Sequence, residues 1–150
     1  MCLVVFAWKA HPDYRLIVIA NRDEFHARPT EKMHWWPDQP DVLAGRDLQA
    51  GGTWLGIGKT GRFATVTNYR EQTTPHRGLA SRGELATNFI GDSQDEPYQY
   101  NAGLNGDGYA GFSLLTATRD KISYVSNRGD QATELAPGVF GLSNASLDTP

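Results

Sequence analysis

The sequence is poor in several features, and each shortage excludes a class of protein. A single cysteine in 150 residues rules out an internal disulfide framework and fits a reducing compartment. The net charge is −3 and the arginines are scattered without a basic stripe, so we expect no nucleic-acid partner. The apolar runs at residues 2–8 and 16–20 are too short to cross a bilayer. With no secretory signal visible either, we expect a cytoplasmic protein without a transmembrane segment.

Glycine and proline, by contrast, are plentiful. Sixteen glycines and eight prolines favour short strands joined by tight turns over long helices. The chain is long enough to bury a sizeable core. Because no repeat, linker or low-complexity tract is visible, we expect residues 1–150 to form a single domain.

Pairs of apolar segments separated by turn residues predict β-hairpins. The first pair, residues 2–8 and 15–20, is apolar without alternation, which predicts strands buried on both faces. A second pair at 53–57 and 62–67 flanks a glycine-rich turn. Further strands are expected at 110–118 with 121–127, and at 42–44, 133–135 and 139–143.

Helices are expected only in the middle of the chain. Ser81 and Glu84 have the spacing of a capping box, and the apolar residues that follow predict a helix over 82–90. A weaker helical pattern covers 95–103, whereas the proline-containing segment 27–41 is expected to be irregular. The order of hairpins, helices and further hairpins predicts an α+β fold of antiparallel sheet packed with helices.

Cys2 is the first candidate for chemistry. Removal of Met1 would leave a residue that carries a thiol and an α-amine with a pKa near 8, and the amine could serve as base for the thiol. A small apolar residue that merely begins a strand is the alternative, and the position alone does not choose between the two.

A polar cluster follows the second strand directly. Arg22 can hold a thiolate or a ligand carboxylate, and Asp23 or Glu24 can orient an amine. The alternative is a polar turn with a surface ion pair. So much charge next to so apolar a strand favours a functional site.

Two asparagines, Asn68 and Asn144, end predicted strands. Their amides could donate hydrogen bonds to a developing oxyanion, although asparagine at such positions is more often a turn residue. The match to GxGxxG at residues 56–61 is discounted, because a strand and not a helix follows it. No metal site is expected, since the histidines lack the spacing of ligands. These are His11, His26, His34 and His76.

Several segments together resemble the NRDE family, also called the transport-and-Golgi-organisation family. They are Cys2, Asn21–Phe25, the run from Val42 through Asp47, the run from Gly51 through Gly56, Thr67–Arg70 and Gly141–Asn144. The family is similar in layout to the N-terminal-nucleophile hydrolases. The resemblance therefore implies an αββα sandwich of antiparallel sheets. Family members are usually longer, so we expect the domain to be incomplete at its C-terminus.

The hydrolase layout implies a role for each candidate residue. Cys2 would be the nucleophile, and Asn68 and Asn144 would occupy the oxyanion and substrate-amide positions. The hydrolases carry an arginine and an aspartate three residues apart after the second strand. Here that spacing gives Asn21 and Glu24, or slips by one onto Arg22, which departs from the pattern of a competent amidase.

The family resemblance implies a different activity, namely intracellular haem binding and trafficking, with links to lipid and acyl-CoA metabolism. As a haem carrier, the chain would bind its small amphipathic ligand in a cleft formed by Cys2, Asn21–Glu24, Asn68 and Asn144. Arg22 or Arg46 would meet a propionate or phosphate, and Trp54 would cover the flat face of the ligand. As an N-terminal-cysteine amidohydrolase, it would use Cys2, Arg22, Asp23, Asn68 and Asn144. Acyl-CoA or lipid-metabolite binding is a further alternative. The axial ligands of haem and the oligomeric state stay open.

Overall fold

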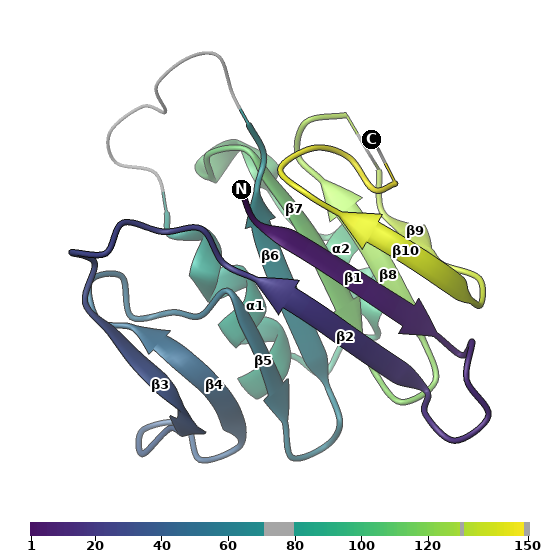
Figure 1. The fold of residues 1–150 in the computed structure, drawn as a ribbon, viewed down its shortest axis with the longest axis horizontal. Helices are drawn as coiled ribbons and strands as arrows, with labels where there is room; N and C mark the ends of the chain where they lie inside the picture. Colours follow the sequence, from purple (N-terminus) through teal and green to yellow (C-terminus); the bar gives the residue numbers. More distant parts are fainter. Residues whose placement is uncertain (71–79, 130, 149–150) are drawn as a thin grey trace.

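Two antiparallel sheets lie face to face in the structure, a computed structural model that describes residues 1–70, 80–129 and 131–148 (Figure 1). The small sheet has the strand order β10-β1-β2, and the large sheet runs from β3 to β9 in sequence order. This arrangement confirms the predicted α+β sandwich. The small sheet consists of β1 (Leu3–Trp8), β2 (Leu16–Asn21) and β10 (Gly138–Leu142). The large sheet consists of β3 (Thr30–Trp35), β4 (Val42–Asp47), β5 (Leu55–Gly58), β6 (Phe63–Asn68), β7 (Phe112–Ala117), β8 (Ile122–Ser126) and β9 (Thr133–Glu134).

The predicted hairpins and helices are confirmed. β1 pairs with β2, β5 with β6 and β7 with β8, all antiparallel. The helices are α1 (Arg82–Gly91) and α2 (Pro97–Ala102), and both lie behind the large sheet in Figure 1. Among the described residues, neither helix has the length and apolar character needed to span a membrane.

The core between the sheets comes from alternate residues of β1. Val4, Phe6 and Trp8 point inward and are almost completely buried, and the ring of Phe6 stacks on Phe140 with centroids 5.1 Å apart. They pack against residues of the large sheet such as Leu115. Alternation of this kind is what a strand with one solvent face requires.

A second core lies between the large sheet and α1, where the glycine-rich segment has a packing role. A methyl group at Gly56 would lie 2.8 Å from the Cβ of Ala44 and 3.1 Å from the side chain of Ile90, so only glycine allows the helix to approach this closely. Gly61 has φ +81° in the turn between β5 and β6. The GxGxxG match is therefore a hairpin with a packing constraint, and not a nucleotide-binding loop.

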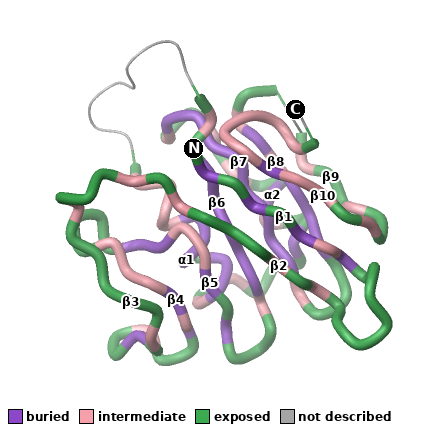
Figure 2. Tube along the Cα trace, in the orientation of Figure 1, coloured by how far each residue is buried: buried purple, intermediate pink, exposed green. Residues whose placement is uncertain are grey.

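The prediction that the first hairpin is buried on both faces is wrong for this chain. Leu3 and Val5 are 39% and 37% exposed on the outer face of β1, and β2 contains no buried residue (Figure 2). The helices cover the large sheet only. No helix among the described residues covers the outer face of the small sheet, so the second helical layer of an αββα sandwich is not present in this part of the chain.

Two local predictions also need correction. Part of segment 27–41 forms the strand β3, which the mixed polar pattern of its six residues concealed. Ser81 does occupy the N-cap of α1, but its side chain makes no capping hydrogen bond. The Glu84 carboxylate instead accepts a hydrogen bond of 2.7 Å from the Tyr109 hydroxyl, so the reciprocal capping box does not form.

Candidate functional site

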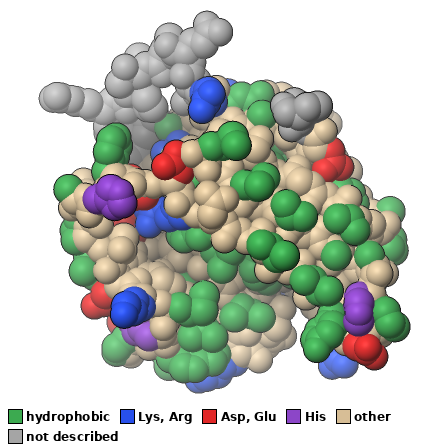
Figure 3. All heavy atoms as spheres, in the orientation of Figure 1, with side chains coloured by type: hydrophobic (Ala, Val, Ile, Leu, Met, Phe, Trp, Pro, Cys, Tyr) green, Lys and Arg blue, Asp and Glu red, His purple; other side chains and the backbone are tan. Residues whose placement is uncertain are grey.

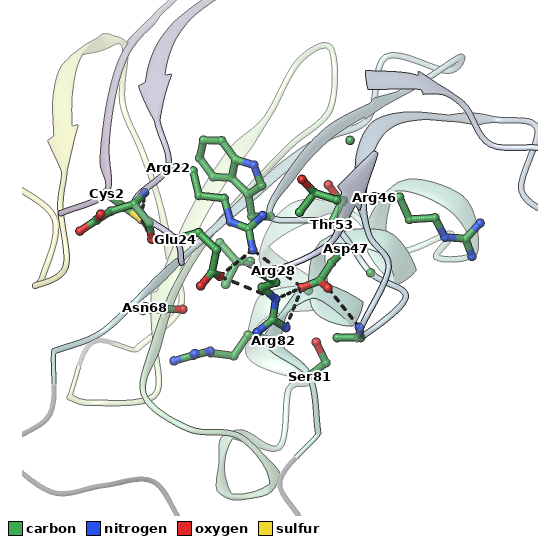
Figure 4. A pocket seen from close by; sticks show the side chains of 18 of the residues that line it. Cys2, Arg22, Glu24, Arg28, Arg46, Asp47, Thr53, Asn68, Ser81 and Arg82 are labelled. Atoms are coloured by element: carbon green, nitrogen blue, oxygen red, sulfur yellow. Dashed lines mark hydrogen bonds and ion pairs between the residues drawn. The ribbon is translucent and has the colours of Figure 1, made fainter. Parts of the chain in front are cut away.

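A cavity of about 590 Å³ opens at the end of the sandwich where β1 begins. It is lined by the residues next to β1 and β2, by strands of the large sheet and by the first turn of α1 (Figure 4). Of the predicted site residues, its lining includes Cys2, Arg22, Asp23, Glu24, Arg46, Trp54 and Asn68. The fold therefore brings together segments that lie far apart in the sequence.

The thiol of Cys2 is fixed at the wall of this cavity. The residue is 7% exposed, and its Sγ accepts a hydrogen bond of 3.4 Å from the backbone N–H of Asp23. Its own backbone N–H donates to Oδ1 of Asn144 at 3.0 Å. The thiol also lies 3.9 Å from the backbone carbonyl of Asp23, to which it can donate, so the sulfur is oriented by the backbone of the Asn21–Glu24 motif.

Residue 1 is held by two members of the Asn21–Glu24 motif. The Met1 ammonium pairs with the Asp23 carboxylate, and the Met1 carbonyl accepts from Nδ2 of Asn21 at 3.0 Å. The hydrogen bond and charge of this ammonium lower the pKa of Asp23. With Met1 in place, Asn21 and Asp23 therefore bind the N-terminus of the chain itself.

The other two members of the motif belong to a network of four charges. Arg22 contacts Glu24 at 2.8 Å, and Arg28 contacts Asp47 at 2.7 Å. Longer contacts of 3.8 Å join Arg22 to Asp47 and Arg28 to Glu24. The dashed lines of Figure 4 show this network beside the cavity. Because positive and negative side chains alternate in this network, each arginine is held in place by two carboxylates.

Asp47 is the most enclosed member of the network, with a side chain 13% exposed. Burial by itself would raise the pKa of Asp47. The hydrogen bond from Arg28, together with the backbone N–H groups of Ala50 and Gln49, outweighs burial and lowers the pKa overall. The carboxylate is therefore ionised at neutral pH. Arg28 and Asp47 were not predicted from the sequence as site residues. Of the two, only Asp47 could have been found from the sequence, because it ends one of the segments that resemble the family.

The two asparagines lie close to each other but play different parts. Asn144 donates through Nδ2 to the backbone carbonyl of Asn68 at 2.8 Å, while its Oδ1 accepts from Cys2. Its amide is thus occupied at both ends and ties β1 to β6. Asn68 lines the cavity with an exposed side chain. Of the pair, Asn68 is the one placed to contact a ligand.

Arg46 lies at the cavity wall, but its guanidinium is engaged elsewhere. It makes two hydrogen bonds to Asp38, at 2.6 and 2.7 Å, and lies 4.3 Å from the ring centre of Trp36. Figure 4 shows the Arg46 side chain directed away from the ion-pair network. Trp54, by comparison, is half-buried and packs against both cores.

The first turn of α1 forms another part of the wall, which the sequence analysis did not assign to the site. Ser81, Arg82 and Gly83 line the cavity, and Nη1 of Arg82 donates to the carbonyl of Gly111 at 3.0 Å. The backbone of Gly52 packs directly on Gly83, since a methyl group at Gly52 would lie 2.6 Å from the Gly83 carbonyl carbon. This glycine pair lets the loop before β5 meet the helix.

Metal ligands do not gather in this cavity. Within residues 1–70, 80–129 and 131–148 there is no group of three or more His, Cys, Asp or Glu side chains suited to a metal ion. Of the four histidines, His76 lies outside the described residues.

Comparison with known proteins identifies the family. The sequence model of Transport and Golgi organisation 2 matches residues 1–150. The chain belongs to this family. The resemblance carried by the Asn21–Glu24 motif is therefore confirmed.

The matched relatives are longer than the chain. The chain is 40% identical over 164 aligned positions to the "Transport and Golgi organization protein 2 homolog" of Bos taurus and 39% identical over 164 to that of Homo sapiens. Each match covers 100% of this chain and 59% of the relative. Transport and Golgi organization protein 2 of Drosophila melanogaster is 32% identical over 129 positions, which cover 77% of the chain and 45% of the fly protein. The chain thus spans about three fifths of the mammalian relatives that it matches.

Proposed function

We propose that this protein binds haem in the cavity beside Cys2 and acts as an intracellular haem carrier. One observation carries the proposal: an oriented thiol and a network of two arginines and two carboxylates share one open cavity of about 590 Å³. This volume falls within the range of small-molecule sites, roughly 300 to 1,000 Å³.

The chemistry of the cavity wall supports haem as the ligand. A cysteine thiolate is an established axial ligand of haem iron. Among the described residues that line the cavity there is no histidine or methionine, which leaves the Cys2 sulfur as the iron ligand in this proposal. The sulfur of Cys2 would hold the metal, and the macrocycle would occupy the cavity at this end of the sandwich.

The arginines would receive the propionates. Arg22 and Arg28 each contact one carboxylate closely and make a long contact of 3.8 Å to a second carboxylate. A propionate could replace a long contact without breaking a short one, and it would gain a charge-assisted hydrogen bond. Such a bond is worth about 1.5 to 3 kcal/mol when both groups are ordered.

Haem titration followed by absorption spectroscopy tests this proposal. We expect a saturable shift of the Soret band, a different band position for Cys2→Ser, and about tenfold weaker binding for Arg22→Ala, since about 1.4 kcal/mol corresponds to a factor of ten. Arg15→Ala is the matched control. Arg15 is an exposed arginine that pairs with Asp120 far from the cavity, and its loss should not change the affinity. An unsaturable titration, or equal affinities for Arg22→Ala and wild type, would sink the proposal.

A second candidate function, an N-terminal-cysteine amidohydrolase, is favoured by the surroundings of the Cys2 nitrogen. After removal of Met1, this nitrogen would be an α-amine beside Oδ1 of Asn144, with the thiol of the same residue at the cavity wall. The thiol would pass its proton to the α-amine and attack an amide carbonyl, and Asn68 would donate to the oxyanion. The resulting ammonium would return the proton to the leaving amine as the C–N bond breaks. Water would then hydrolyse the thioester, releasing the carboxylic acid and the free thiol. The occupied amide of Asn144 makes this candidate weaker.

Intact-mass measurement separates the two candidates. The hydrolase requires loss of Met1, whereas haem binding through the sulfur does not. Retention of Met1 in protein that cleaves a small amide would contradict the hydrolase mechanism. If the protein cleaves a small amide only after Met1 is removed and does not bind haem, the hydrolase would be favoured over the carrier.

A further inference from the structure

The strand β2 is apolar along nearly its whole length but is not enclosed by the fold. Its first five residues are Leu-Ile-Val-Ile-Ala, and none of them is buried. β2 pairs with β1 and forms one edge of the small sheet. A row of backbone N–H and C=O groups on its other side is therefore available for pairing.

The other apolar surfaces around β2 are also open. A groove of about 550 Å³ lies beside it, with Leu16 and Val18 on one wall and Leu55 and Ile57 of the large sheet on the other. On the outer face of the small sheet, five apolar residues are 36% to 73% exposed, and no charged residue of the three strands separates them. These are Leu3, Val5, Ile17, Ile19 and Val139. Figure 3 shows hydrophobic side chains along this face and in the hollow next to it.

The edge strand β3 of the large sheet makes an instructive contrast. Its sequence, Thr-Glu-Lys-Met-His-Trp, carries charged side chains, and its pairing with β4 has an irregularity between Glu31 and His34. Charges and bulges are the devices by which permanent edge strands avoid unwanted pairing. β2 has no charged residue, no proline and an uninterrupted register with β1. By this criterion the sequence of β3 is typical of an edge strand, and the sequence of β2 is typical of a strand that is paired on both sides.

We infer that β2 is the docking edge for a further polypeptide segment, of the kind that family members carry beyond the region matched by this chain. The segment adds at least one strand beside β2, its apolar side chains fill the groove and cover Ile57, and the chain that follows covers Ile19 on the outer face. The unmatched length of the mammalian relatives favours this occupant, because the match covers 59% of each and the rest supplies enough polypeptide for further strands. An apolar groove next to a free strand edge fits a strand better than it fits a free amphiphile.

A chimera tests the inference by cysteine labelling. The 150-residue chain is compared with the same chain continued by the C-terminal region of the bovine relative, both in a Cys2→Ser background with Ile19→Cys. Ile19 is 73% exposed in the chain described here. We expect the labelling rate at position 19 to fall at least tenfold in the chimera. Tyr14→Cys, at an exposed position of the β1–β2 turn, is the matched control and should label equally in both proteins.

Hydrogen exchange adds an independent readout on the 150-residue chain alone. The β2 amides that do not donate to β1 should exchange fast, and an apolar dye should bind. A folded monomer with protected β2 amides and no dye binding would overturn the inference, whether or not the chimera folds.

Three other outcomes would also overturn it. Equal labelling at position 19 in a folded chimera would show that the edge is not used. A dimer of the 150-residue chain cross-linked through position 19 would assign the surface to a second copy. Saturable binding of one amphiphile that persists in the chimera would assign the groove to a small molecule. None of these results depends on haem binding at Cys2.

Discussion

The two ends of β1 face cavities of similar size and opposite chemistry. At the Cys2 end, about 590 Å³ is lined by arginines and carboxylates that hold one another in place. At the Trp8 end, about 550 Å³ is lined mostly by aliphatic and aromatic side chains. The first cavity can stay open to water because its charges are solvated and paired. The second exposes apolar area that water disfavours by about 25 cal/mol per Å². Chemistry rather than volume therefore separates a ligand site from an uncovered interface.

The difference arises from where polar residues enter the chain. Asn21–Glu24 follow β2 without a gap, so their charges meet Cys2 at one end of the hairpin. At the other end the hairpin turn lies outside the sandwich, and only apolar residues of β1 and β2 face inward. The β1–β2 hairpin thus forms part of a polar cavity at one end of the sandwich and part of an apolar groove at the other end.

The largest contrast between the ends should be in stability. Trp8 is 2% exposed and belongs to the core between the sheets, so Trp8→Ala should cost about 3 to 5 kcal/mol of unfolding free energy. Asn68→Ala, at an exposed position of the polar end, should change it by less than about 0.5 kcal/mol. Urea unfolding measures both. Equal losses would show that the polar end is also part of the folding core.

A smaller effect should appear at the polar end as acid sensitivity. Because the folded pKa of Asp47 is lowered, its contribution is complete above the unfolded value of about 3.9 and is lost as the pH falls through the folded pKa. Asp47→Asn should cost about 1 to 2 kcal/mol at pH 7 by removing the partner of Arg28. Its stability should also fall less than that of wild type below pH 4. Parallel pH profiles in urea unfolding would contradict this assignment.

The smallest effect should be at the open wall of the apolar groove. Ile57 is 40% exposed, so Ile57→Ser should change stability by about 0.5 kcal/mol or less. Its register partner Phe63 is 7% exposed, and Phe63→Ala should cost about 3 kcal/mol. Thermal unfolding of the pair compares the two positions. A large loss for Ile57→Ser would show that the groove wall is already enclosed.

Part of the site was predictable because it is local in the sequence. The thiol of Cys2 and the motif Asn21–Glu24 lie at adjacent ends of one hairpin, and hairpin pairing brings them together. Arg28 was missed because it lies in segment 27–41, which was expected to be irregular and has no pattern that indicates a site. Asn144 was predicted as a ligand contact, yet its amide bridges Cys2 and Asn68, a role that depends on strands far apart in the chain.

The sequence by itself determined the three hairpins and the position of α1, because apolar runs, glycine turns and apolar spacing are local signals, whereas the polar strand β3 gave no such signal. It also determined that the first hairpin is apolar on both faces. Only the tertiary structure decided which of those faces is buried, since burial depends on what packs against a strand and not on the strand. For the same reason, the pairing of Arg28 with Asp47 and the outward turn of Arg46 toward Asp38 became visible only once the sheets were assembled.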